Sequence, residues 1–177
     1  MQVVRPDPSE YVPYFGRYID LVPGQDVLRA LGDQVEGSLA ALRKVSKEDS
    51  LRRYAPGKWS VREVLGHLID AERIFAYRAL TFARNDQTEL PGFEQDDYVP
   101  AGRFDERPWE DLITEFEAVR RATILMFNGL DGDAWSRRGV ANGNAMSVRA
   151  LAYAIAGHEL HHMSVIRTKY LQSPAGN

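Results

Sequence analysis

Residues 59–68 read Trp-Ser-Val-Arg-Glu-Val-Leu-Gly-His-Leu, and this stretch predicts the start of a long helix. Ser60 and Glu63 have the spacing of a capping box, in which each side chain accepts a hydrogen bond from the other residue's backbone N–H. Trp59 and Val64 are placed to form a hydrophobic staple around that box. The apolar residues that follow recur every three or four positions, so a single amphipathic helix is expected. Its inner face consists of Val64, Leu68, Ala71, Phe75 and Phe82.

Three further segments show the same periodicity, so with the helix from Ser60 to about Arg84 the sequence predicts four amphipathic helices. The other three span roughly residues 26–44, 108–128 and 147–171. Four such helices predict an all-α, single-domain four-helix bundle with long connecting loops. An irregular all-α arrangement of the same helices is the alternative, and no segment predicts a β-strand.

The remaining segments are connections and ends. We expect an N-terminal arm, residues 1–23, that packs on the body through its aromatic side chains, followed by the bundle at 24–172 and a tail at 173–177. Two connections, 85–107 and 130–146, are long for a compact domain. Loops of this length are more often functional than idle, so they are candidates for the walls of a binding site.

Composition limits the classes of function. The chain has 177 residues, a formal net charge of −3 and no cysteine. A disulfide framework, a thiolate nucleophile and a cysteine-based zinc site are therefore excluded, and no basic surface for nucleic acid is indicated. No stretch is long and apolar enough to predict a membrane span or a signal peptide. We expect a cytoplasmic protein that acts on a small molecule and binds neither nucleic acid nor membrane, with a homodimer left open.

The four histidines are distributed unevenly. His158, His161 and His162 lie within five residues, and His67 lies on the helix that Ser60 begins. Positions i and i+4 share one face of a helix, so His158 and His162 both point inward with the apolar residues around them. Two imidazoles on one helix and a third on another can bind a metal ion and leave coordination positions open. The predicted ligands are thus His67, His158 and His162, with His161 at the edge of the face.

The segment 158–162 also matches H-E-x-x-H, the pattern of zinc metalloproteases. Those enzymes need a third ligand further along the chain, and no His, Asp or Glu follows His162. The protease interpretation is therefore disfavoured. Glu159 is kept as the candidate catalytic residue, acting near the metal, with the alternative that it only orients a histidine.

Arg78 lies on the same face as His67, three helical turns along. We interpret it as a candidate substrate-binding residue that holds a carboxylate at the far end of a pocket. The alternative is a salt bridge on the surface of the helix. Asp96 and Asp97, in the connection 85–107, are either close to the metal or part of a solvated acidic loop.

Two stretches carry a resemblance to a known family. Residues 59–68 and the Gly-His-Glu-Leu-His-His segment at 157–162 together resemble the DinB-like superfamily, and the resemblance extends from about residue 25 to 171. It implies a four-helix bundle with one divalent metal ion per chain, held by His67, His158 and His162. Nickel and zinc are the metals that it favours, with iron and manganese as alternatives, and water completes the coordination shell.

The resemblance implies a range of reactions rather than one. Some members are similar to thiol S-transferases that use bacillithiol or a related small thiol, another is a mycothiol-dependent maleylpyruvate isomerase, and many are described only as metal-dependent hydrolases. An open metal position can bind a thiol and lower its pKa, as it does for water. We therefore expect a metal-dependent enzyme with thiol-transferase-like chemistry and a low-molecular-weight thiol as co-substrate. A metal-dependent hydrolase, or a non-catalytic metal- or ligand-binding stress-response protein, is the alternative.

Overall fold

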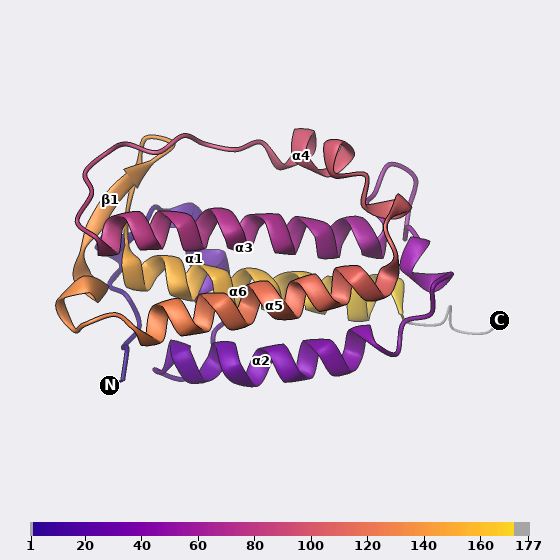
Figure 1. Ribbon diagram of the computed structural model, residues 1–177, viewed down its shortest axis with the longest axis horizontal. Helices are drawn as coiled ribbons and strands as arrows, with labels where there is room; N and C mark the ends of the chain where they lie inside the picture. Colours follow the sequence, from indigo (N-terminus) through magenta and orange to yellow (C-terminus); the bar gives the residue numbers. More distant parts are fainter. Residues whose placement is uncertain (1, 172–177) are drawn as a thin grey trace.

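Four long helices lie side by side in the computed structural model, which describes residues 2–171 (Figure 1). They are α2 (Val27–Leu42), α3 (Val61–Ala83), α5 (Trp109–Asn128) and α6 (Val148–Val165). Each of the four packs against two others, in the cyclic order α2, α5, α3, α6. The four-helix bundle expected from the periodicity is thus confirmed, with ends within a few residues of those expected for three of the helices.

The ends of the helices follow local chemistry. At the start of α3 the Ser60 hydroxyl accepts a hydrogen bond from the Glu63 N–H at 3.0 Å, and the Glu63 carboxylate accepts one from the Ser60 N–H at 2.7 Å. Ser147 caps α6 in the same way, accepting from the Ala150 N–H. Pro108 is the residue immediately before α5. The last turn after α6, Ile166–Tyr170, is a wider π-helical turn.

The direction of the helices explains one of the long connections. α3 and α5 run the same way, and both run opposite to α2 and α6 (Figure 1). α3 has 23 residues, which corresponds to a rise of about 34 Å. The chain must therefore return along the whole length of α3 before α5 can begin beside its start. The segment between them makes that return and lies along one side of the bundle.

The two long connections contain structure that the periodicity did not predict. The first carries the short helix α4 (Gln95–Gly102). The second forms an antiparallel hairpin of β1 (Arg138–Ala141) and β2 (Asn144–Ser147), so the prediction that no strand occurs was wrong. The turn is Asn142-Gly143, and both residues have positive φ, 52° and 68°. An Asn-Gly pair is a strong hairpin signal, but four-residue strands are too short to show a clear alternation.

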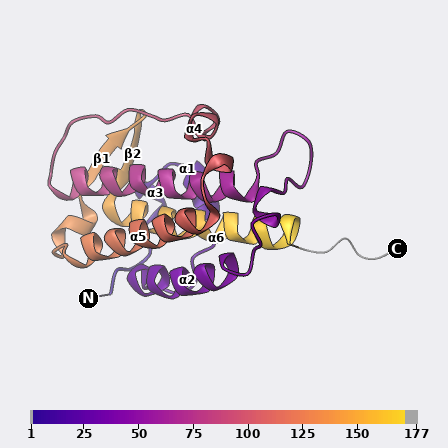
Figure 2. The same cartoon turned by 45° about the vertical axis from the view of Figure 1, so that its right-hand side comes forward.

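The N-terminal segment contributes a further helix, α1 (Pro13–Ile19), which packs against α6. Val3, Ile19 and Val22 from this segment are buried in the same apolar core as α6. In Figure 2, α1 lies behind α3 on the side of the hairpin. Single 3-10 turns complete the structure at Pro8–Glu10, Asp49–Leu51, Phe104–Glu106 and Asp133–Ser136. The tail expected at 173–177 lies outside the described residues.

A buried charged network ties the four long helices together at mid-bundle. Arg120 of α5 donates two hydrogen bonds of 2.8 Å to Glu72 of α3 and a further one to Glu159 of α6. Ser38 of α2 donates to the other oxygen of Glu159 at 2.5 Å. Burial lowers the pKa of Arg120, but the two carboxylates outweigh it and raise the pKa overall, so the guanidinium stays charged. One residue from each helix thus sets the axial register of the bundle.

Among residues 2–171, no helix combines the length and the apolar character needed to cross a lipid bilayer.

Candidate metal centre

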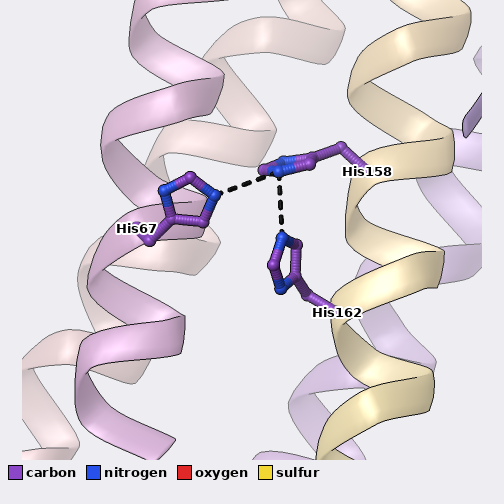
Figure 3. A group of neighbouring side chains, drawn as sticks. All are labelled: His67, His158 and His162. Atoms are coloured by element: carbon purple, nitrogen blue, oxygen red, sulfur yellow. Dashed lines mark hydrogen bonds between the residues drawn. The ribbon is translucent and has the colours of Figure 1, made fainter. Parts of the chain in front are cut away.

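Three imidazoles converge between α3 and α6 (Figure 3). The Nε2 atom of His158 lies 3.1 Å from that of His67 and 3.1 Å from that of His162. His67 and His158 are buried and His162 is partly buried. Because His158 and His162 are one turn apart on α6, both reach the same point, and His67 reaches it from α3. The structure therefore brings together the three histidines that the sequence singled out.

The three nitrogens fit a metal ion better than they fit one another. The lone pair of an imidazole nitrogen lies in the ring plane and serves one partner well, yet the Nε2 atom of His158 faces two nitrogens. Nitrogens bound tetrahedrally at about 2.05 Å from zinc would lie about 3.3 Å apart. The observed separation of 3.1 Å is close to this value. A divalent cation would accept all three lone pairs and remove the mismatch.

Burial keeps the three rings neutral, which is the form that binds a metal. Burial lowers the pKa of His67 to about 4, although the charge of Asp96 opposes the shift. Burial, followed by repulsion from His67 and His161, lowers the pKa of His162 to about 3. Burial also holds the pKa of His158 well below its usual range. At neutral pH the three rings therefore carry no positive charge that would repel a cation.

His161 lies outside this cluster. Its side chain is exposed, and its ring packs against Tyr18 of α1 with 5.6 Å between the ring centres. Tyr18 also packs edge-on against His158, at 5.2 Å. Burial raises the pKa of the Tyr18 phenol to about 12, so this side chain stays neutral next to the histidines. Of the four histidines, three therefore share one site and the fourth belongs to its rim.

Glu159 does not belong to the cluster of three nitrogens. Both of its carboxylate oxygens are held by Arg120 and Ser38 in the buried network, and the side chain is 1% exposed. The hydrogen bonds of its carboxylate go to other helices and not to an imidazole, so the role of orienting a histidine stays a prediction. Its contacts give no support to direct work on a substrate.

A cavity of about 440 Å³ extends from the histidines along α3. His67 and His158 lie at its wall, and Arg78 lines it three turns further along α3. Both long connections contribute to it, as does α1. Its apolar walls are formed by Val12, Phe15, Tyr18, Ala71, Phe75, Phe82, Phe93, Met146 and Leu151.

A second cavity of about 320 Å³ also reaches the histidines. It is lined by His161 and His162, and by residues before α3 and at the end of the chain such as Lys58 and Tyr170. Asp96, at the start of α4, lines both cavities. His67 and His158 thus line one cavity and His162 lines the other.

One contribution to the site was not predicted from the sequence: α1 supplies Phe15 and Tyr18. The connections 85–107 and 130–146 were expected to form walls, and both line the cavity, the second through residues such as Asn142 and Asn144. The aromatic residues of the N-terminal segment were a signal that it packs on the body, but not that it packs over the histidines. Contacts between segments this far apart in the chain have no local signature.

Comparison with known proteins supports the fold. A family model described as the DinB superfamily matches residues 28–166. Among solved structures, YfiT from Bacillus subtilis superposes with a TM-score of 0.70 at 15% sequence identity, covering 93% of this chain and 90% of that one. YfiT is described as a probable metal-dependent hydrolase with an unusual four-helix bundle topology. No match was found among curated protein sequences.

Proposed function

The chain belongs to the DinB superfamily, and we propose that it is a metal-dependent enzyme that transfers a low-molecular-weight thiol to a small electrophile. In this proposal His67, His158 and His162 hold one divalent ion, with nickel or zinc as the first candidates. The observation that carries the proposal is the convergence of three neutral imidazoles beside a substrate-sized cavity, with the Nε2 atom of His158 3.1 Å from those of His67 and His162.

The two cavities favour a reaction with two substrates. A bound divalent ion would supply positive charge that lowers the pKa of a coordinated thiol or water. The chain has no cysteine that could compete with a thiol substrate. In the transfer the thiol loses its proton, its sulfur forms a bond to carbon, and the leaving group departs with the electron pair of the broken bond. Asp96, which lines both cavities, is our candidate to accept that proton.

Hydrolysis is the second candidate, and one finding favours it: the structural neighbour YfiT is described as a probable metal-dependent hydrolase. Activated water would then take the place of the thiol, and one cavity would be sufficient. The same three histidines would serve both reactions, so ligand substitutions alone do not separate them.

The experiment combines metal analysis with a reaction screen. Purified protein should carry about one divalent ion per chain, and His162→Ala should lose most of it. Bacillithiol, mycothiol, glutathione and coenzyme A are each incubated with alkylating electrophiles, and adducts are measured by mass spectrometry. We expect conjugation with at least one thiol that disappears on chelation and in His162→Ala.

His161→Ala is the matched control, since it removes an exposed imidazole next to the proposed ligand. It should keep the metal. Metal-dependent cleavage of esters or amides without any thiol adduct would establish the hydrolase instead. Full metal occupancy in His67→Ala would remove that residue from the site.

A further inference from the structure

Arg78 differs from the other buried arginines in the described part of the chain. Arg120 has two carboxylate partners, and Arg62 donates to the Ser50 hydroxyl and to three backbone carbonyls. Arg78 is 7% exposed and donates one hydrogen bond, of 2.9 Å, to the carbonyl of Pro91. Within residues 2–171 no carboxylate lies within ion-pair distance of it.

The surroundings of Arg78 are apolar on two sides. Its guanidinium carbon lies 5.8 Å from the ring centre of Phe75 and 5.9 Å from that of Phe93. The rings shield the cation from water without neutralising it, and burial lowers its pKa. A buried cation without a counterion is unfavourable, so an anion that entered the cavity would be bound strongly. Because Arg78 lines the cavity, its unused N–H groups can be reached from there.

The position of Arg78 sets the shape of the ligand. It follows His67 by eleven residues on α3, which places both side chains on one face with their Cα atoms about 16 Å apart. Between them the cavity is lined by Ala71 and Phe75 of α3, with Phe15 from α1. A ligand that reaches both ends therefore has an anionic head, an apolar middle and a second end at the histidines.

The charges of the cavity select the kind of anion. A single planar guanidinium matches one carboxylate with two parallel hydrogen bonds. Glu94 and Asp96 also line the cavity and would repel a dianion such as a phosphate monoester. The side-chain amides of Asn142 and Asn144, on the hairpin, offer neutral hydrogen-bond donors to the same cavity.

We infer that this cavity binds a small amphipathic carboxylic acid, with its carboxylate on Arg78, its aryl or alkyl body along Phe75 and Phe15, and its other end at the three histidines. That the end of the ligand near the histidines is the reacting group rests on the proposed function. The binding of its carboxylate by Arg78 does not depend on that function. The inference assigns the electrophile of the proposed reaction to the class of monocarboxylic acids.

Binding to the purified protein tests this directly. Phenylbutyrate and its neutral analogue phenylbutyramide have nearly the same shape and differ in charge. Isothermal titration should give affinity for the acid that exceeds affinity for the amide by about tenfold or more. Arg78→Gln should reduce acid binding to the level of the amide and leave amide binding unchanged. Arg84→Gln, an exposed arginine at the end of the same helix, should leave both unchanged.

Repeating the titration after chelation separates the two ends of the cavity. A carboxylate held by Arg78 keeps its preference over the amide in the metal-free protein, even if no reaction is ever found. If the preference for the acid over the amide were lost on chelation, the carboxylate would lie at the metal and the inference would be overturned. The same conclusion would follow if that preference survived in Arg78→Gln. Equal binding of acid and amide to the unaltered protein would also overturn it, without depending on whether any variant folds.

Discussion

At Gly157 the backbone of α6 touches that of α1. A Cβ atom at this position would lie 1.9 Å from the carbonyl oxygen of Tyr18, a distance that no adjustment of a side chain can relieve. Tyr18 in turn packs against His158. We predict that Gly157→Ala displaces α1 and destabilises the protein by about 1–3 kcal/mol, with weaker metal binding as a second effect. Urea unfolding and metal titration measure the two.

The same substitution at Gly37 is the control. Gly37 is exposed within α2, and nothing lies within 4 Å of a Cβ built there. Gly37→Ala should stabilise the protein by up to about 1 kcal/mol because alanine favours helix more than glycine does. If the two variants had the same stability, the contact between α1 and α6 would not be close enough to matter.

Some residues of the site could be predicted from the sequence and others could not. The spacing of His158 and His162 on one helix face is a property of the sequence, and the structure brings both next to His67. The role of Glu159 could not be read in the same way. Its partner Arg120 is 39 residues away in the chain, so only the tertiary structure reveals that its carboxylate is occupied.

At the scale of the helices, the buried network of Arg120 makes the sharpest prediction. Arg120→Met leaves Glu72 and Glu159 buried without a counterion, and removing one partner of a buried ion pair costs about 3–5 kcal/mol. Equilibrium urea unfolding measures the loss. A triple variant, Arg120→Met with Glu72→Gln and Glu159→Gln, should recover a large part of it because no unpaired charge remains. No recovery would show that packing of the arginine, and not its charge, stabilises the helices.

The ion pair between Glu10 and Arg149 ties the N-terminal segment to α6, and it predicts a pH dependence. Arg149 donates to both carboxylate oxygens, one at 2.7 Å. Burial would raise the pKa of Glu10, but the hydrogen bonds from Arg149, Ser147 and the Asp7 backbone lower it overall from 4.5. A carboxylate with a lowered folded-state pKa stabilises the protein above about pH 4.5, and this stabilisation is lost as the pH falls through the lower value.

Glu10→Gln should therefore destabilise the protein by about 1–3 kcal/mol at pH 7. The difference from the unaltered protein should shrink as the pH is lowered below about 4.5. Urea unfolding at several pH values measures both. A difference that stays constant with pH would mean that the shape of the side chain matters and its charge does not.

The elements also divide into those that the sequence predicts and those that it does not. The long helices were predictable because each has several turns of apolar periodicity and a cap such as Ser60 or Ser147. α4 has eight residues with two acids in its first turn and Pro100 inside, so it shows no such periodicity. The hairpin and α1 are short in the same way and are stabilised by the bundle on which they pack.

On the scale of the whole molecule, the arrangement predicts that the fold does not depend on the metal. The apolar core extends along the bundle in two clusters of buried side chains, and the Arg120 network joins all four long helices. None of these contacts involves the Nε2 atoms of the three histidines. The chelated protein should keep its helical circular dichroism at room temperature and unfold cooperatively on heating.

Metal should then raise the unfolding temperature by mass action, since it binds the folded chain and not the unfolded one. The stabilisation grows with the logarithm of free metal concentration and reaches about 3–4 kcal/mol at a hundred to a thousand times the dissociation constant. Calorimetric scans of the chelated protein with increasing zinc or nickel measure this slope. His162→Ala should fold like the chelated protein and show almost no such rise, whereas His161→Ala should follow the unaltered protein. A chelated protein without helical signal would instead make the ion a structural one, because the three histidines would then be needed to hold α3 against α6.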